Sequence, residues 1–436
     1  MGHERYNIIV VGAGLAGITA ALKCAQNNMS VLLIERGPYP GSKNMFGGVI
    51  YRKALEKIIP AFWKKDVPLE RAIIRDELWL VDTESAVQMA FEKQDYGCPP
   101  YNKFTVIRSR FDNWYAQQAE KAGAHLKTAS TVTDILFEKK GLLNKKACGV
   151  KLDNDQKIYS DLVIICEGLI GNLVHKTGLK RRKSTASLAL YVKEHLQLPR
   201  DKIEERFNLG PGEGLNIGIS GTPTSGAIGK GGIWTNQDTI SLVIGAYLNQ
   251  IISKNINPYQ LLQNFKEHPL LKKRISGART VEYLAHLIPK GNPGEMPKLY
   301  DHGLLVAGDA LTMVGGQGSA FAMLSGKLAA ETAIKAAAKD KYDRKILTSY
   351  NNKLHNLFIT KDNLAQKNKK NYFKNYSDSD LLMAKAVNKI ASEYSRFTME
   401  TNKKKWQKIS SEFKNFQPLP KTISDIITGL KNWRLL

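Results

Sequence analysis

The sequence predicts an α/β protein with three parts: a Rossmann-like domain, a discontinuous second domain built on an antiparallel sheet, and a helical C-terminal region. Three observations predict it. A short apolar run at residues 6–11 ends in glycines and leads into a helical pattern, as in a β-α-β unit. Residues 184–297 are rich in strands with alternating polar and apolar positions. Residues 339–436 have a helical and strongly basic pattern.

The first domain begins with the run at 6–11, which is typical of a buried parallel strand because it is continuously apolar. Residues 14–26 predict a helix and residues 30–34 a second strand, which completes a β-α-β unit. Further along, Asp112 is expected to cap a helix that extends to about Ala122. The remaining elements of this domain are predicted as strands at 132–138, 148–152, 162–166 and 303–307 and a helix at 319–337.

Two strand-rich segments interrupt this domain. Alternation such as Thr239-Ile-Ser-Leu-Val-Ile suits an antiparallel sheet with one covered face. The tail that follows carries 21 basic and 9 acidic residues, a net charge of +12. The predicted boundaries are 1–70, 92–183 and 298–338 for the first domain, 71–91 and 184–297 for the second, substrate-side domain, and 339–436 for the basic helical region.

Charge and cysteine usage limit the classes of function. The 436 residues include 64 Lys and Arg against 40 Asp and Glu, and the net charge of +24 usually implies an anionic partner such as nucleic acid, lipid head groups or an acidic protein. Nucleic acid is disfavoured because no RNA- or DNA-binding module is recognisable. No apolar run of about 18 residues predicts a membrane span. We expect no metal site and a reduced, cytoplasmic chain, because no metal-binding spacing joins the four cysteines, Cys24, Cys98, Cys148 and Cys166.

A G-x-G-x-x-G motif predicts a dinucleotide site. It reads Gly12-Ala13-Gly14-Leu15-Ala16-Gly17, directly after the first strand and at the start of the first helix. Gly12 permits the tight turn, Gly14 lets the backbone approach a pyrophosphate, and Gly17 lets the helix lie close to the sheet. Glu35 closes the second strand, where its carboxylate can accept hydrogen bonds from ribose hydroxyls.

A second glycine-rich strand end distinguishes a flavin from a nicotinamide cofactor. The apolar run Gly303-Leu-Leu-Val-Ala ends in Gly308-Asp309, and an Asp at this position can hold a ribityl hydroxyl, a group that NAD lacks. The alternative is that Asp309 only caps a helix. Gly315, Gly316 and Gly318 then lead into a helix near Ser319, whose N-terminal dipole could face the N1–C2=O edge of a flavin.

Further motifs follow in order along the first 335 residues. They are Gly41-Ser-Lys43-Asn44-Met-Phe-Gly47-Gly48, Leu55-Glu-Lys-Ile-Ile-Pro60, Leu69-Glu-Arg71, Val106-Ile-Arg108 with Phe111-Asp112, Tyr283-Leu-Ala-His286-Leu-Ile-Pro289, Met296-Pro-Lys-Leu299, and Ser325-Gly-Lys-Leu-Ala-Ala-Glu331. In these motifs the chain resembles the FixC-type branch of the electron-transfer flavoprotein:quinone oxidoreductases, within the class of FAD proteins that includes geranylgeranyl reductases and aromatic hydroxylases. The resemblance implies a fold like that of p-hydroxybenzoate hydroxylase.

The resemblance also implies a function. FAD would accept electrons from an electron-transfer flavoprotein and pass them toward quinone, with a separate ferredoxin-like subunit, because no cysteine after Cys166 could ligate a cluster of the chain's own. No side-chain catalyst is then required, although His286 is a candidate proton donor and equally a structural histidine. The predicted FAD contacts are Gly12, Ala13, Gly14, Leu15, Ala16, Gly17, Glu35, Arg36, Lys43, Asn44, Gly47, Gly48, Arg108, Val132, Glu167, Gly168, Gly308, Asp309, Gly316, Gly318 and Ser319.

The chain departs from the family pattern near the flavin. Glu167-Gly168 stands where the class often has Asp-Gly, Lys290 replaces an acidic residue, and the loop after Ala310 is short and lacks an arginine. These departures leave the electron acceptor and the flavin potential open. The alternative function is a geranylgeranyl-reductase-like or hydroxylase-like enzyme acting on a lipidic or small substrate. A nucleic-acid-binding flavoprotein or a non-catalytic scaffold is a third hypothesis.

The end of the chain carries an amphipathic pattern. Apolar residues recur at helical spacing within 422–436 beside Lys431 and Arg434. We expect this segment to contact an anionic membrane surface on its cytoplasmic side, an acidic partner protein, or the protein's own core.

Overall fold

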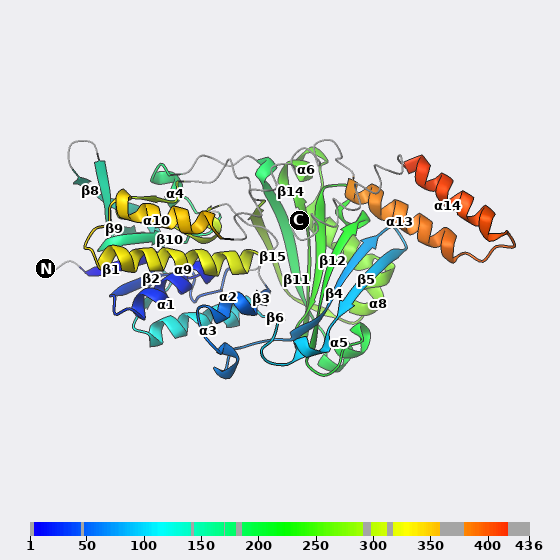
Figure 1. Ribbon diagram of the computed structural model, residues 1–436, viewed down its shortest axis with the longest axis horizontal. Helices are drawn as coiled ribbons and strands as arrows, with labels where there is room; N and C mark the ends of the chain where they lie inside the picture. The colour runs from blue at the N-terminus through cyan, green and yellow to red at the C-terminus, as the bar shows by residue number, and fades with distance from the viewer. Residues whose placement is uncertain are drawn as a thin grey trace. The chain divides into compact units, whose positions relative to one another are not determined.

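The computed structural model describes residues 4–44, 48–140, 144–169, 171–179, 185–290, 298–311, 317–357 and 379–416, which form two compact units (Figure 1). Unit 1 contains the described residues of 4–70, 99–187 and 287–357, and unit 2 those of 71–98, 188–286 and 379–416. The predicted C-terminal region is thus divided, because its first helix belongs to unit 1 and its later helices to unit 2.

Unit 1 is built on a mostly parallel sheet. The strand order is β16-β17-β10-β1-β2-β7, and β16 alone in this order runs antiparallel to its neighbour. Continuous apolar sequence explains the arrangement, since Ile8, Ile9 and Val10 of β1 are fully buried. The strands are β1 (Arg5–Val11), β2 (Val31–Ile34), β7 (His125–Lys127), β10 (Lys157–Ile165), β16 (Tyr300–Asp301) and β17 (Leu304–Val306).

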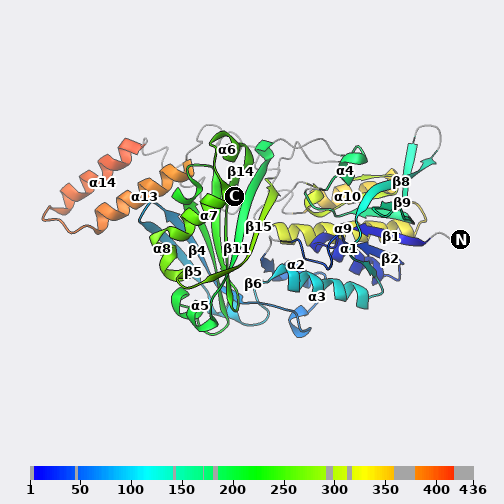
Figure 2. The ribbon, with the colours of Figure 1, turned by 180° about the vertical axis from the view of Figure 1, so that it is seen from behind.

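Helices and two smaller groups of strands complete unit 1. Helix α1 lies beside α9 in both views (Figures 1 and 2). Strands β8, β9 and β10 form an antiparallel meander, as the apolar runs at 132–138 and 148–152 predict. Strand β3 pairs with β6. The bounds are α1 (Leu15–Ala25), α2 (Arg52–Glu56), α3 (Arg108–Lys121), α4 (Leu173–Lys176), α9 (Gly318–Ala337), α10 (Arg344–His355), β3 (Val49–Tyr51), β6 (Lys103–Thr105), β8 (Val132–Lys140) and β9 (Asn144–Leu152).

The prediction that Asp112 caps α3 is wrong. The helix begins one turn earlier, at Arg108, and its N-cap is Ile107. Asp112 is fully buried inside the helix, where its carboxylate accepts two hydrogen bonds of 2.7 Å from the guanidinium of Arg108. The ion pair that Asp112 makes with Arg108 inside the helix therefore outweighs the preference of an aspartate for the N-cap position.

Unit 2 is built on a largely antiparallel sheet. The strand order is β15-β11-β14-β13-β12-β4, with β5 paired to β4 and with β12 parallel to β4. Helix α7 packs on β11 and β14, and its Leu261, Leu262 and Phe265 join the buried cluster of the sheet. The bounds are β4 (Ala72–Val81), β5 (Ala86–Glu92), β11 (Leu188–Gln197), β12 (Glu213–Gly221), β13 (Gly229–Thr235), β14 (Thr239–Tyr247), β15 (Arg279–Pro289), α5 (Arg200–Phe207), α6 (Leu248–Ser253), α7 (Pro258–Glu267) and α8 (Pro269–Ile275).

The second sheet differs in one respect from the expectation of a single covered face. Residues 239–246 of β14 are all buried, on both faces of the strand. Ser241 and Gly245 make this possible because they are small, and the Ser241 hydroxyl accepts a 3.0 Å hydrogen bond from Asn236. A polar residue can be buried without penalty when it is paired in this way.

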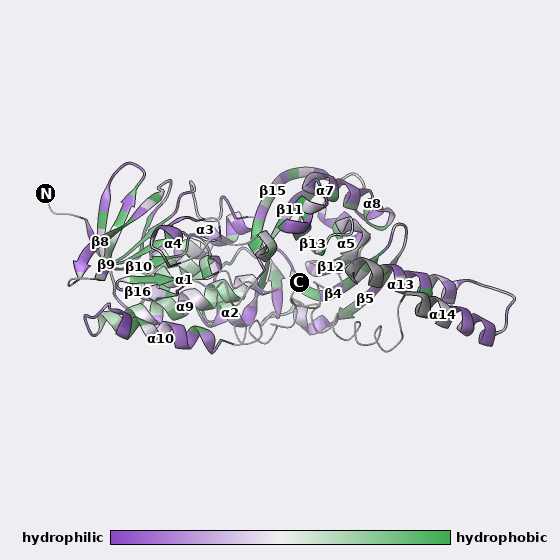
Figure 3. Cartoon of the chain, turned by 90° about the horizontal axis from the view of Figure 1, so that it is seen from above, coloured by the Kyte–Doolittle hydropathy of each residue, from purple (hydrophilic) through white to green (hydrophobic). Residues whose placement is uncertain are grey.

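Two C-terminal helices belong to unit 2. Helix α13 (Ser379–Ser395) packs on β4 and β12, and α14 (Asn402–Phe416) packs on α13. Figure 3 shows purple, hydrophilic residues along α14, as its sequence NKKKWQKIS requires. Within the described ranges, no helix combines the length and the apolar character needed to cross a bilayer.

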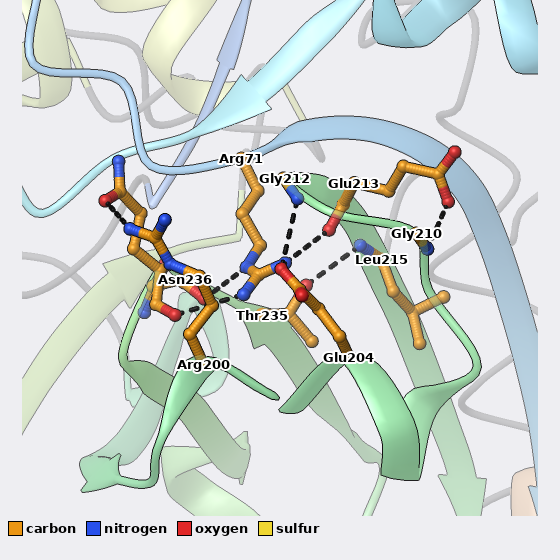
Figure 4. A network of polar contacts seen from close by, with 10 residues as sticks. Arg71, Arg200, Glu204, Gly210, Gly212, Glu213, Leu215, Thr235 and Asn236 are labelled. Carbon is orange, nitrogen blue, oxygen red and sulfur yellow. Dashed lines mark hydrogen bonds and ion pairs between the residues drawn. The ribbon is translucent and has the colours of Figure 1, made fainter. Parts of the chain in front are cut away.

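A buried arginine ties together the segments at one end of unit 2 (Figure 4). The side chain of Arg71 is fully buried, pairs with Glu204 at 2.8 Å, and donates to the backbone oxygens of Asn236, Glu213 and Gln237. Burial alone would raise the pKa of Glu204, but hydrogen bonds from the Gly212 N–H and from Arg71 hold that pKa below its usual value. Arg71 of the Leu69-Glu-Arg71 motif therefore has a structural role, because its contacts stabilise unit 2.

Arg71→Ala should lower the free energy of unfolding by about 3–5 kcal/mol, because it removes the cation that pairs with the Glu204 carboxylate and the donor to three carbonyl oxygens. Arg200→Ala is the matched control, since exposed Arg200 makes one bond to Gln237 and should change stability by less than about 0.5 kcal/mol. Urea unfolding monitored by circular dichroism measures both. Equal midpoints for the two variants would contradict the assignment.

Candidate functional site

The candidate site lies where four neighbouring parallel strands of unit 1 end. Val11 of β1 is in register with Ile34 of β2 and with Ile165 of β10, and Ile165 is in register with Val306 of β17. The loops that follow therefore start at the same level of the sheet. Strand order also reverses at β1, where β2 lies on one side and β10 on the other, and ligands of open α/β sheets bind at such a point.

The first of these loops is the Gly12–Gly17 turn. Gly12 has a φ of +101°, and a Cβ on Gly17 would lie 1.9 Å from the carbonyl oxygen of Gly12, so both positions require glycine. A Cβ on Gly14 would instead meet nothing closer than the Asn44 amide nitrogen at 3.9 Å among the residues that the structure describes. The turn is thus packed tightly against the protein at Gly12 and Gly17, whereas the space next to Gly14 is free of described protein atoms.

Helix α1 presents its first backbone N–H groups toward that opening. Its N-cap is Gly14, which supplies no side-chain hydrogen bond, and its first turn contains no acidic residue. The first N–H groups of a helix have no partner within the helix, and they bind anions together with the helix dipole. Leu15, Ala16 and Gly17 therefore fit a pyrophosphate, as the motif predicts.

Glu35 lies beside the turn at the end of β2. Its Oε2 accepts from the Ala13 N–H at 2.9 Å and its Oε1 from the Gly37 N–H at 2.7 Å. A carboxylate has about four acceptor positions, so ribose hydroxyls can still be accommodated. Arg36, the next residue, is exposed.

The segment before β8 lies against the same loop. The Ser130 N–H donates to the Glu35 carbonyl at 3.0 Å and the Ala129 N–H to the Gly37 carbonyl at 2.8 Å. Predicted contact Val132 follows two residues later at the start of β8, where it is half-buried. The structure thus brings Val132 and Glu35 into one neighbourhood.

The fourth loop carries the Gly-Asp motif. Gly308 has a φ of +69° and donates its N–H to the Ser325 hydroxyl of α9 at 3.0 Å, and a Cβ on Gly308 would approach Ala16 of α1 to 2.8 Å. Asp309 follows in a short 3₁₀ helix, Gly308–Leu311. The Gly-Asp motif is therefore placed beside the N-terminal turn of α1.

Helix α9 offers a second N-terminus. It begins at Gly318, has no side-chain cap and has no acidic residue in its first turn. The Ser319 hydroxyl donates to the Val49 carbonyl at 2.9 Å, which fixes this end of the helix. Gly316 and Gly47 are predicted contacts that lie outside the described residues.

A buried network joins two predicted contacts. Asp112 accepts from Arg108, as described above, and from the Asn44 amide at 2.6 Å. The sequence predicts Asn44 and Arg108 as cofactor contacts but does not predict that Asp112 holds them together. Gly41 permits the approach, because a Cβ there would lie 2.5 Å from the Arg108 carbonyl. Lys43 is exposed on the same segment, and Gly48, five positions further along the chain, is buried.

Glu167 has a structural role that the sequence did not reveal. Its carboxylate accepts from the N–H groups of Leu173 and Val174 at 3.0 and 2.8 Å, and so it caps helix α4. A Cβ on Gly171 would clash with this carboxylate at 2.1 Å. Gly168 has a φ of +74°, and a Cβ there would meet no atom of the described residues within 4 Å, so its backbone can approach a ligand.

One face of the unit 2 sheet carries a row of polar and aromatic side chains. Trp234, Ser241 and His195 are in register across β13, β14 and β11, so they share a face. The Lys193 ammonium lies 5.6 Å from the ring centre of Trp234. The pKa of His195 is lowered to about 3, chiefly because the imidazole is buried and in addition because of the positive charge of Lys193. No local pattern in the sequence singles out these residues.

His286 lies on β15 and is half-buried. All four cysteines are free thiols, and Cys98 alone among them is exposed. Over the described part of the chain, no three His, Cys, Asp or Glu side chains are grouped to hold a metal ion.

The geometry therefore fits a dinucleotide with a flavin half. Two helix N-termini, one open glycine position and two acidic residues at strand ends are arranged around one edge of a sheet. This arrangement can neutralise a pyrophosphate and hold hydroxyl groups on either side of it.

Comparisons with known proteins agree with this geometry. A family described as FAD dependent oxidoreductase matches residues 7–192. Protein FixC of Bradyrhizobium diazoefficiens is 39% identical over 367 residues, covering 83% of each chain, and protein FixC of Azotobacter vinelandii is 36% identical over an alignment of 443 positions, covering 99% of each chain.

Solved structures show the same fold at low identity. The structure of a geranylgeranyl bacteriochlorophyll reductase-like protein from Thermoplasma acidophilum has a TM-score of 0.72 and 18% identity, covering 98% of this chain and all of that chain. The flavin-dependent brominase Bmp2 has a TM-score of 0.61 and 18% identity, covering 80% of this chain and 84% of its own. The predicted α/β fold class is confirmed.

Gly14→Val should weaken FAD binding about 10- to 100-fold while leaving the fold intact, because the added methyl groups enter the space kept for the pyrophosphate. Gly17→Val is the contrasting variant, since its side chain meets the Gly12 carbonyl and should destabilise the apoprotein itself. Titration of apoprotein with FAD and thermal unfolding without FAD separate the two effects. Full flavin retention by Gly14→Val would rule out this placement.

Asp112→Asn should lower FAD affinity by about tenfold and also reduce stability, because Arg108 and Asn44 lose the charged acceptor that fixes them. Glu56→Gln is the matched control: it breaks another i,i+4 pair with an arginine of unit 1, at a half-exposed position. Flavin titration and chemical unfolding of both variants provide the measurements. An Asp112→Asn protein that matches Glu56→Gln in both would refute the positioning role.

Proposed function

The chain belongs to the FixC family of FAD-dependent oxidoreductases, and we propose that it passes electrons from an electron-transfer flavoprotein through FAD toward a quinone. Bound FAD supplies the redox chemistry. The protein contributes binding, orientation and the electrostatic environment.

The observation that carries this proposal is the common level of the four strand ends. It places the Gly12–Gly17 turn beside Glu35 on one side and beside Gly308–Asp309 on the other. The N-terminus of α1 binds the pyrophosphate, Glu35 the ribose, and Asp309 the ribityl chain. The dipole of α9 stabilises negative charge at the flavin edge.

A protein donor is supported by similarity over most of the chain to proteins named FixC. The sequence also contains no second G-x-G-x-x-G after a strand, which would otherwise suggest a nicotinamide site.

A separate ferredoxin-like subunit is supported by the cysteines. Within the 436 residues the last cysteine is Cys166, and among the described residues no three His, Cys, Asp or Glu side chains are grouped to hold a metal ion. Thiolates that ligate iron–sulfur clusters are grouped, unlike these four separate cysteines.

A second candidate is reduction or hydroxylation of a lipidic or small substrate. The polar and aromatic row of Trp234, Ser241 and His195 on the unit 2 sheet favours it, because binding sites combine apolar walls with a few placed polar groups. The fold likeness to a geranylgeranyl bacteriochlorophyll reductase-like protein is compatible with the same candidate.

Stopped-flow mixing distinguishes the two candidates. We expect a reduced electron-transfer flavoprotein to bleach the FAD absorbance at a catalytic rate, and NADH or NADPH alone to do so far more slowly, because the chain lacks a second nucleotide fingerprint. A quinone analogue should then restore the oxidised spectrum. Rapid reduction by either nicotinamide would favour the second candidate.

A further inference from the structure

Strand β5 forms one edge of the unit 2 sheet. Its residues, Ala86–Glu92, pair with β4, and no other strand of the described residues pairs with them. Figures 1 and 2 show β5 beside β4, and residues 88–92 are all exposed. An edge of this kind presents a row of backbone N–H and C=O groups to which a further strand can bind.

The hydrogen bonds of the β4–β5 hairpin determine which backbone groups point outward. The Lys93 N–H donates to the Ile74 carbonyl at 3.0 Å, and the Asp82 N–H donates to the Ser85 carbonyl at 2.9 Å. The register between these two bonds is unbroken. Because hydrogen-bonded pairs alternate along an antiparallel ladder, the odd-numbered residues of β5 bond to β4. The even-numbered residues of β5 therefore direct their N–H and C=O groups away from the sheet.

The side chains of β5 leave this edge unprotected. Natural edge strands usually avoid pairing with other chains by means of charged residues, prolines or bulges, and residues 86–91 contain none of these. Val87, Met89 and Phe91 share one face of the strand, and Met89 and Phe91 are 43% and 60% exposed. Strand β15, at the far end of the strand order, differs because it carries an arginine and a glutamate within its first four residues.

A second copy of β5 is complementary to this edge. When two copies run antiparallel with Met89 at the centre, the outward backbone groups of one strand lie opposite those of the other. The two Met89 side chains then face each other. Each Val87 lies opposite a Phe91, and each Glu92 lies opposite an Ala86. Apolar side chains thus meet on the exposed face, and directly opposite pairs of this kind stabilise a sheet.

The charges that flank the strand favour this register and this partner. Glu92 lies 3.2 Å from Arg75, and Lys93 lies 2.9 Å from Asp95, so both are paired within one copy. Moving the centre by one residue toward the hairpin turn would instead bring Glu92 opposite Glu84, and like charges in opposite positions are destabilising. A partner recognised by its charge would find no opposite charge on residues 86–91. A second copy needs none.

We propose that the protein self-associates through β5, with the two strands antiparallel across a two-fold axis at Met89. The unit 2 sheets of the two copies then form one continuous sheet, and the interface is isologous. A single strand is small beside the about 20–30 residues that each side of a standard interface contributes, so the association is weak and depends on concentration. The proposal is independent of the cofactor and of the route of the electrons.

Sedimentation velocity of the holoprotein at about 1–100 µM tests self-association. The wild type should shift from monomer toward dimer as its concentration rises, and salt should strengthen the shift, because it screens the repulsion between two chains of charge +24. Met89→Lys should stay monomeric, since it places two lysines opposite each other. Val281→Lys is the matched control, at a 47% exposed position of β15, and should behave like wild type. The two variants should unfold thermally at the same temperature.

Disulfide cross-linking tests the register, in a Cys98→Ser background because Cys98 is exposed. Met89→Cys should cross-link to itself on mild oxidation, because a non-hydrogen-bonded antiparallel pair places its Cα atoms about 4.5 Å apart. Phe91→Cys is the control, since its two copies would lie more than about 13 Å apart along the strands, too far for a disulfide. Mixing Phe91→Cys with Val87→Cys should restore the cross-link.

Three results would overturn the proposal. The first is wild-type protein that stays monomeric over this concentration range at high salt. The second is Met89→Lys protein that self-associates as wild type does, including the case in which it loses only binding to an electron-transfer flavoprotein, which would assign the edge to that partner. The third is Phe91→Cys protein that cross-links to itself as efficiently as Met89→Cys.

Discussion

The close approach of α1 to its neighbours is the constraint on which the site depends. Gly17 packs against the carbonyl of Gly12, and Gly326 of α9 packs against the carbonyl of Ala16, at distances that admit no side chain. These contacts fix where α1 begins relative to the strand ends. Since Gly308 also packs on Ala16, the flavin-side loop is positioned by the same helix. One set of small residues therefore places the pyrophosphate site and the Gly-Asp motif together.

Local sequence was sufficient to predict the parts of the site that depend on a strand, a turn and a helix adjacent in the chain. The Gly12–Gly17 turn, Glu35 and Gly308–Asp309 are such parts, because periodicity and glycine placement reveal them directly. The bond between Asn44 and Asp112 joins residues 68 positions apart, and no local pattern indicates it. The sequence around Asp112 fits a helix cap, and so predicts one. Only the fold shows that the Asp112 carboxylate instead binds Arg108 and Asn44.

Long-range pairing likewise changes the meaning of the family motifs. Arg71 lies in a stretch that resembles the family and Glu167 at a position where the chain departs from it, but one holds three segments of unit 2 and the other caps a short helix. Their carboxylate and guanidinium groups are satisfied by the protein itself. Similarity in such a motif therefore reports the fold as much as the chemistry, and the site must be argued from the backbone donors and carboxylates at the strand ends.

The electrostatics of the cofactor site and of the C-terminal region are of different kinds. At the site, positive potential comes from helix N-termini, a fixed backbone arrangement that requires no excess of basic residues. The net charge of +24 is therefore not explained by cofactor binding. Half of it belongs to the residues from 339 onward, and the described part of that region joins lysines to Phe397 and Met399. Apolar residues exposed this fully are a liability in water.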